Sequence, residues 1–321
     1  MIAPLVAPTL EQIVAARDRL RGVAVRTPLV RLAVDAPCEI WLKLEMLQPT
    51  GSFKIRGAWS RMSAATPDTL RDGVYTASAG NMAQGIAWSA QRMGVSCRVI
   101  VPDHAPATKV AAVERMGASV RRVPFDEWWK IMQRHGDPTE HGMFVHPVAD
   151  PWVVAGNGTI GLEIAEDMPD VDAVVVPFGG GGLSCGIAAA LRASGMQTPV
   201  FAAEVETAAP FSAALAAGKP VATAHVPSFV DGIGGKGVLP EMWPMASALL
   251  ASSCISSLDE IARTIRILVE RARIVAEGAG AAPVASALAG KAGNGRVICV
   301  VSGGNIDVAT LQIILEGKTP K

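Results

Sequence analysis

The sequence has no excess of charge of either sign, because 29 lysines and arginines are balanced by 29 aspartates and glutamates among its 321 residues. Proteins that bind nucleic acid or anionic lipid concentrate basic side chains, and this composition provides no such field. We therefore expect a small molecule as the partner, with no nucleic acid and no membrane.

Cysteine is scarce and irregularly placed. The five cysteines are odd in number and do not have the spacing of a metal site. They are Cys38, Cys97, Cys185, Cys254 and Cys299. Reduced, buried thiols in a cytosolic protein explain them best.

Targeting and membrane-spanning patterns are missing as well. Residues 1–7 have neither a basic start nor a cleavage site. No apolar run reaches the roughly 18 residues that cross a bilayer. Together with reduced cysteines, this predicts a soluble cytoplasmic protein.

Hydrophobic residues make up 50% of the sequence, which suits buried parallel strands and closely packed helices. From residue 74 onward strand patterns alternate with helical ones, which requires right-handed crossovers and a parallel sheet. Strands are predicted at 74–77, 97–101, 119–123, 144–145, 173–176, 200–203 and 297–301. Helices are predicted near 9–21, 82–93, 107–116, 126–134 and 258–273. The fold class is α/β, with a small inserted domain at 71–147 and a large domain formed by 1–70 and 148–321.

One lysine lies where an amine becomes reactive. A strand is predicted at 39–45, a turn follows, and a helix begins near Lys54, with Ser52 able to cap it. In the first helical turn the aligned peptide dipoles disfavour a cation, and Phe53 adds an apolar neighbour. Lys54 is thereby pushed toward its neutral, nucleophilic form and is the first candidate catalytic residue.

Four consecutive glycines, Gly179 to Gly182, connect a buried strand to a helix that begins near Leu183. Only glycine lets successive backbone N–H groups converge on one point, and the helix adds its positive end. The turn therefore suits a phosphate. It does not match a nucleotide-binding pattern, so a cofactor with a single phosphate is favoured.

Two further turns place polar groups at the carboxyl ends of strands, where open α/β sheets bind ligands. Ser78, Ala79, Gly80 and Asn81 follow the strand at 74–77 and open a helix that can hold a carboxylate. Ser302 follows the last buried strand.

Together these four stretches resemble the fold type II enzymes of pyridoxal 5′-phosphate, specifically the threonine and serine dehydratases with their relative serine racemase. The resemblance covers residues 27–307. It implies a tryptophan synthase β-like fold, with two parallel-sheet α/β domains and the cofactor in the cleft between them. The cofactor-binding residues that it implies are Phe53, Lys54, Asn81, Gly179, Gly180, Gly181, Gly182, Leu183, Gly232, Glu277 and Ser302. The segment Ser78, Ala79, Gly80 and Asn81 is similar to the loop that grips the substrate carboxylate.

The sequence departs from this family at three points. Met82 stands where relatives have His, and Ala79 stands where racemases have the serine that protonates the second face of the substrate carbanion, which argues against racemisation. Glu204 matches the first ligand of the family's divalent-cation site, but Pro210 occupies the position of the second. We therefore expect no bound metal.

The resemblance implies β-elimination from a β-hydroxy amino acid such as L-threonine or L-serine, which gives a 2-oxo acid and ammonia. Lys54 is implied to carry the cofactor and to act as general base. A homodimer is expected.

Other functions stay open. The substrate is alternatively 3-hydroxyaspartate, phenylserine or a hydroxyectoine-derived compound, because 125–130 and 229–236 also look like dehydratases linked to hydroxyectoine breakdown. Serine racemase, β-replacement as in cysteine synthases, and a metabolite-binding protein with a degenerate pocket are the remaining alternatives.

Trp128 and Trp129 are expected to be core anchors.

Overall fold

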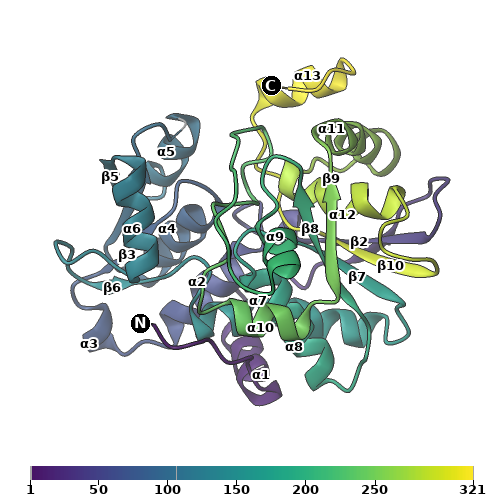
Figure 1. The fold of residues 1–321 in the computed structure, drawn as a ribbon. Coiled ribbons are helices and arrows are strands. Elements are labelled where there is room, and N and C mark those ends of the chain that lie inside the picture. The colour runs from purple at the N-terminus through teal and green to yellow at the C-terminus, as the bar shows by residue number, and fades with distance from the viewer. Residues whose placement is uncertain (1, 106, 321) are drawn as a thin grey trace.

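The computed structural model describes residues 2–105 and 107–320, and its strands form two sheets (Figure 1). The six-stranded sheet has the order β1-β2-β10-β7-β8-β9, and only β1 is antiparallel to its neighbour. These strands are β1 (Leu29–Arg31), β2 (Glu39–Leu44), β7 (Ala173–Pro177), β8 (Val200–Val205), β9 (Ser252–Ser256) and β10 (Arg296–Val301). The four-stranded sheet is parallel throughout, in the order β5-β4-β3-β6. Its strands are β3 (Val74–Ala77), β4 (Cys97–Pro102), β5 (Ser119–Val123) and β6 (Met143–Phe144).

Helices cover both faces of each sheet. They are α1 (Leu10–Arg19), α2 (Lys54–Ser63), α3 (Pro67–Leu70), α4 (Asn81–Met93), α5 (Ala107–Glu114), α6 (Phe125–Arg134), α7 (Pro151–Asp167), α8 (Gly182–Ala193), α9 (Pro210–Ala217), α10 (Trp243–Leu249), α11 (Leu258–Ile267), α12 (Gly278–Leu288) and α13 (Val308–Leu315), with a 3-10 turn at Glu45–Leu47. None of the helices in the described ranges is both long and apolar enough to span a bilayer.

Successive residues of a strand point to opposite faces, and each sheet fills two cores in this way. In β10, Cys299 packs with α11 and α12, whereas Ile298 and Val300 pack with α7, α8 and α10. In β4, Val99 packs with α2, α4 and α5, whereas Ile100 packs with α6. Because α2 belongs to the core of the four-stranded sheet and leaves from β2 of the six-stranded sheet, it joins the two layers (Figure 1).

The sequence predicted the α/β class and the parallel sheets, and both are confirmed. The predicted cap of α2 is wrong, because the backbone of Ser52 pairs with Gly303 and the helix starts after Phe53. Among the residues that the structure describes, the Ser52 hydroxyl has no hydrogen-bond partner. The predicted helix at 258–273 ends at Ile267 and continues as a π-helical turn over Leu268–Ala272. The division into domains at 71–147 stays a proposal, and all strands of the four-stranded sheet lie within that range.

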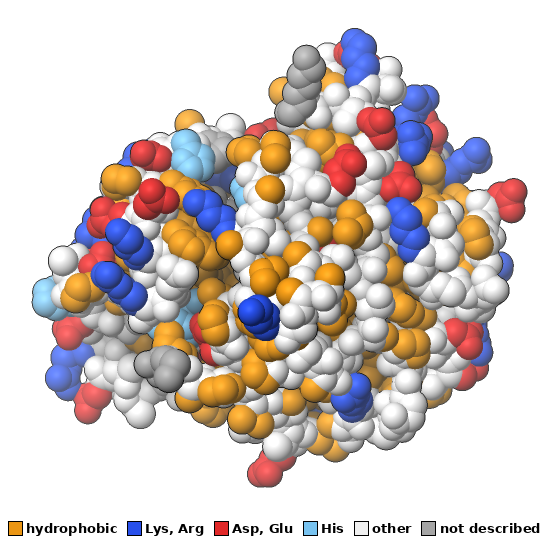
Figure 2. Space-filling model, in the orientation of Figure 1, with side chains coloured by type: hydrophobic (Ala, Val, Ile, Leu, Met, Phe, Trp, Pro, Cys, Tyr) orange, Lys and Arg blue, Asp and Glu red, His pale blue; other side chains and the backbone are white. Residues whose placement is uncertain are grey.

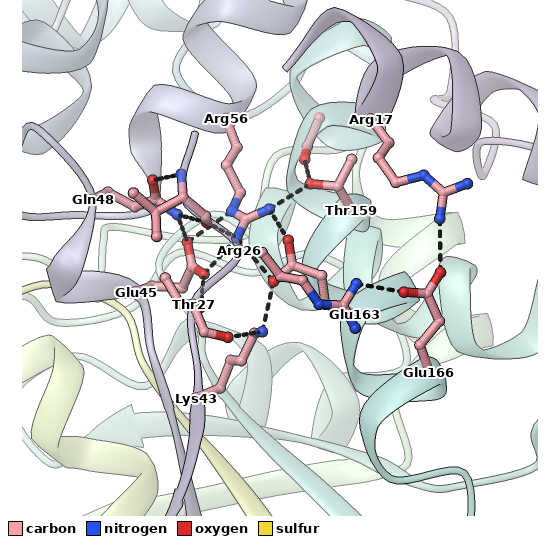
Figure 3. A network of polar contacts seen from close by, with 12 residues as sticks. Arg17, Arg26, Thr27, Lys43, Glu45, Gln48, Arg56, Thr159, Glu163 and Glu166 are labelled. Carbon is pink, nitrogen blue, oxygen red and sulfur yellow. Dashed lines mark hydrogen bonds and ion pairs between the residues drawn. The ribbon is translucent and has the colours of Figure 1, made fainter. Parts of the chain in front are cut away.

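Four buried charged side chains lock α2 in place (Figure 3). We call them the Arg56 cluster, which consists of Lys43, Glu45, Arg56 and Glu163. The guanidinium of Arg56 donates to Glu45 at 2.8 Å and to Glu163 at 2.7 Å. The Lys43 ammonium lies 2.6 Å from Glu163 and donates to the carbonyl of Thr27 at 2.6 Å. The cluster therefore ties β2, the 3-10 turn, α2 and α7 together with no net charge.

The position of Arg56 within α2 matters for the site. Residues two apart in a helix point in nearly opposite directions, since each residue turns the helix by about 100°. Arg56 therefore holds one side of the first turn, and Lys54 projects from the other.

We expect Arg56→Met to lower the free energy of unfolding by about 3–5 kcal/mol, because it leaves the carboxylates of Glu45 and Glu163 buried without their partner. Urea unfolding measures this loss. The control is Arg17→Met, which breaks an exposed pair with Glu166 and should cost less than about 1 kcal/mol. Equal losses in the two variants would contradict a special role for the buried cluster.

Candidate active site

A cavity of about 500 Å³ lies where the two sheets face each other, and it receives residues from both. Every residue predicted to bind the cofactor or the substrate carboxylate lines this one cavity. They come from the start of α2, the segment after β3, the loop after β7, the loop between α9 and α10, the start of α12 and the end of β10. The carboxyl ends of parallel strands thus converge on one space, as expected for an open α/β fold. The role of each residue stays a prediction.

Lys54 is the amine of this cavity. Its Nζ donates to the carbonyl of Pro147 at 3.0 Å and lies 5.1 Å from the centre of the Phe53 ring. Burial lowers the pKa of Lys54 to about 8, and the carboxylate of Glu277 opposes this shift. An amine with this pKa is partly neutral near physiological pH, so it can attack a carbonyl or accept a proton.

Glu277 and two asparagines form a polar chain beside the amine. The amide of Asn81 donates to Glu277 at 2.7 Å, and the amide of Asn305 donates to the Asn81 oxygen at 2.7 Å. Burial raises the pKa of Glu277 to about 7, and the nearby charge of Asp231 adds to this. Asn81 is predicted to bind the cofactor, and its donor group is already oriented by Glu277. The position of Asn305 was missed, because an asparagine after a glycine pair is also typical of an ordinary turn.

The glycine loop between β7 and α8 fits a phosphate. Gly181 has a φ of +93°, which a residue with a side chain rarely adopts. A Cβ on Gly180 would lie 2.6 Å from the Val148 side chain, and one on Gly182 would lie 2.9 Å from the Val148 carbonyl. Glycine is therefore required at each position, and the first N–H groups of α8 stay accessible for an anion.

Three aromatic rings of α6 line the far wall of the cavity. Phe125, Trp128 and Trp129 all contribute, with the Trp128 ring 5.7 Å from Phe125 and 6.3 Å from Trp129. The expectation that both tryptophans are core anchors is wrong in part. Trp128 does contact the core around α6, but the buried face of this helix is filled by Ile131 and Met132, so both indoles stay half-buried and reach the cavity.

Glu204, the partial match to a metal ligand, has all its hydrogen bonds inside the protein. Its oxygens accept from the backbone N–H groups of Phe211 and Ser212, both at 2.8 Å, and from the hydroxyl of Ser253 at 2.5 Å. This carboxylate caps α9. Across residues 2–105 and 107–320, no three His, Cys, Asp or Glu side chains gather in a way that could hold a metal ion.

Charges on the visible face of the molecule are mixed. Figure 2 shows lysines and arginines interspersed with acidic side chains, and no broad field of one sign.

The family model described as "Pyridoxal-phosphate dependent enzyme" matches residues 20–303. The chain is 39% identical to the L-threonine ammonia-lyase of Thermotoga maritima, over 96% of this chain and 78% of that protein. It is 35% identical to the catabolic L-threonine dehydratase TdcB of Escherichia coli, over 95% of each. Among solved structures, threonine deaminase isoform 2 of Solanum lycopersicum is similar with a TM-score of 0.83 and 29% identity, over 98% of each chain. Maize serine racemase is similar with a TM-score of 0.82 and 28% identity, over 97% of this chain and 98% of that one.

We expect Glu277→Gln to lower the pKa of Lys54 below about 8, because the lost carboxylate had favoured the ammonium form. Competitive acetylation of the cofactor-free protein, read at Lys54 by mass spectrometry, gives the midpoint. The control is Glu39→Gln, at the start of β2 and outside the cavity, which should leave the midpoint unchanged. An unchanged or higher midpoint in Glu277→Gln would show that the carboxylate does not act on this amine.

Proposed function

The chain belongs to the pyridoxal-phosphate dependent enzymes, and from this membership we propose that it eliminates the β-hydroxyl group of L-threonine or L-serine as water. Hydrolysis of the released enamine, through its imine, takes one water up again and gives a 2-oxo acid and ammonia. The observation that carries the proposal is a partly neutral lysine amine in the same cavity as an all-glycine phosphate cradle. The similarity to threonine ammonia-lyases and dehydratases over most of their length supports it.

The residues present fit pyridoxal phosphate. Lys54 would hold it covalently, the loop from Gly179 to Gly182 would hold its phosphate, and Ser302 and Asn81 would face its ring. Phe53, Leu183, Gly232 and Glu277 complete the wall of the cavity. The bound cofactor supplies an electron sink that makes the α-proton of an amino acid acidic.

The chain's own residues provide position and proton transfer. The N-terminus of α4, preceded by Ser78, offers backbone N–H groups to the substrate carboxylate. The amine of Lys54 accepts the α-proton in its neutral form, which burial makes available near pH 8. The four-carbon stem of this lysine gives the amine the reach to serve both the cofactor and the α-carbon.

Elimination is favoured over racemisation in this proposal. The methyl group of Ala79 carries no proton to deliver to the second face of a substrate carbanion, although Ala79 lines the cavity. Serine racemase remains the alternative. Chiral analysis of the residual serine distinguishes the two, because only racemisation produces D-serine.

A β-hydroxy amino acid with a larger side chain, such as phenylserine, is the second candidate substrate. The aromatic wall of Phe125, Trp128 and Trp129 favours it, because a flat ring packs on such surfaces. The cavity is less suited to a substrate with a second carboxylate, such as 3-hydroxyaspartate, because Lys109, which could bind that carboxylate, is already paired with Asp231.

A cytoplasmic location and a homodimer belong to the proposal. The location is supported by the cysteines, all five of which are free thiols in the described part of the chain. Cys97, Cys185, Cys254 and Cys299 are buried, and Cys38 is partly buried.

We expect Lys54→Ala to abolish both the visible absorbance of bound pyridoxal phosphate and the release of 2-oxo acid from L-threonine and L-serine, because it removes the amine. The control is Lys130→Ala on the exposed side of α6, which should keep both signals. Turnover at the wild-type rate by Lys54→Ala would refute the assignment.

We expect Trp128→Ala to lower kcat/KM for phenylserine about ten-fold or more relative to L-threonine, because the larger ring loses its packing surface. The matched control is Trp152→Ala at the exposed start of α7. Equal effects on both substrates would show that the aromatic wall does not select the side chain.

A further inference from the structure

The segment of residues 146–149, between β6 and α7, holds the amine of Lys54. The carbonyl of Pro147 accepts the hydrogen bond from Lys54 Nζ at 3.0 Å. Within the ranges that the structure describes, no other protein group accepts a hydrogen bond from this amine. A neutral amine that donates one N–H keeps its lone pair directed elsewhere, so this contact orients the amine without blocking it.

The side chain of His146 fixes the shape of this segment. His146 is 2% exposed, and its Nδ1 accepts hydrogen bonds from the backbone N–H groups of Val148 at 3.0 Å and Ala149 at 2.7 Å. These two bonds close a turn around Pro147. The Pro147 C=O and the Val148 N–H belong to the same trans peptide group and point in opposite directions, so holding this N–H on the imidazole directs the carbonyl away from the ring, where it accepts the bond from Lys54. The geometry also sets the tautomer. Because Nδ1 is an acceptor, the proton is on Nε2, which faces the carbonyl of Met132 at 3.2 Å.

His146 stays a neutral acceptor. A proton on Nδ1 would face two N–H donors, and burial lowers the pKa of His146 to about 3, with the neighbouring His135 ring adding to this. The nearby carboxylate of Glu241 interacts with His135, whose Nε2 lies 2.8 Å from it, and not with His146. Nδ1 of His146 therefore stays unprotonated, and remains an acceptor, at the pH values at which enzymes usually work.

The same turn supports the phosphate cradle. The Val148 side chain and carbonyl are the atoms that a Cβ on Gly180 or Gly182 would strike. The segment therefore contacts the glycine loop on one side and the lysine on the other.

We propose that His146 is a positioning residue for the reaction, which holds the Pro147 carbonyl in place as the acceptor for the Lys54 amine whenever that amine is not bonded to the cofactor. The role depends on the proposed function of Lys54. Without the anchor, the flexible stem of the lysine lets the amine sample positions from which it can reach neither the cofactor nor the α-carbon. The rates of the steps in which the amine reacts are therefore lowered, whereas the affinity for substrate at the start of α4 is unchanged.

The test compares two variants. His146→Leu removes the acceptor and keeps an apolar side chain in the buried position. His146→Asn keeps an acceptor, because an asparagine oxygen readily accepts the N–H group two residues later in the chain. The first measurement is the rate at which cofactor-free protein regains visible absorbance after pyridoxal phosphate is added. The second is kcat and KM for L-threonine.

For His146→Leu we expect the rate of cofactor recovery and kcat each to fall about ten-fold, with KM within about two-fold of wild type and the same final absorbance. His146→Asn should recover both rates to within about three-fold of wild type. A purely structural role would instead lower the thermal midpoint and change all constants together.

Wild-type rates in His146→Leu would overturn the proposal, as would an asparagine variant that is as slow as the leucine variant. If His146→Leu does not fold, the asparagine variant decides by itself: rates within about three-fold support the role and slower rates overturn it. Cofactor recovery is measured without substrate. A wild type that recovers absorbance but releases no 2-oxo acid would therefore refute the proposed reaction and leave the role of His146 standing.

Discussion

The structure depends on the neutrality of the Arg56 cluster. Its charges are buried, so each one is tolerable only while its partners are in place. The partners come from β2, the 3-10 turn, α2 and α7. The first three follow one another in the chain, whereas Glu163 of α7 lies 107 residues after Arg56, so α7 must assemble with a distant segment. Once they have, the first turn of α2 has no freedom to rotate. The direction in which Lys54 leaves the helix is then fixed by ion pairs on the opposite side, well away from the cavity that the amine serves.

Electrostatics inside the cavity follow from the same enclosure. Burial acts on Lys54 and on Glu277 in opposite senses, lowering the pKa of the amine and raising that of the carboxyl group. Each group partly offsets the shift of the other. Lys54 and Glu277 can therefore each gain or lose a proton at nearly neutral pH. The anion cradle beside them is built from backbone N–H groups, which do not titrate. Chemistry that moves a proton close to a phosphate group suits such a site.

The sequence predicted the parts of this site that have a local signature. Neighbouring residues alone indicate the chemistry of a lysine at a helix start, or of four glycines between a strand and a helix. All the predicted positions line one cavity. The parts that it missed have no such signature. The Pro147 carbonyl is like any other backbone carbonyl until the fold places Lys54 beside it, and the tautomer of His146 depends on which N–H groups surround the ring. The cap at Ser52 failed for a related reason, since pairing with a residue about 250 positions away displaced a good local motif. The role of Trp128 and Trp129 was predicted only in part, because the sequence of α6 does not show that Ile131 and Met132 fill its buried face and leave both indoles at the cavity.

The contact between Val148 and Gly180 has a consequence for how the cofactor site can change. The glycine loop has no side chains of its own, so its depth is set by the wall against which it rests, and that wall is a valine from a different segment. A smaller residue at position 148 would widen the cradle, and a larger one would close it, without any change in the glycines. Engineering this scaffold to accept a bulkier phosphate ester would therefore begin outside the glycine motif, and sequence drift at these two positions is expected to be correlated.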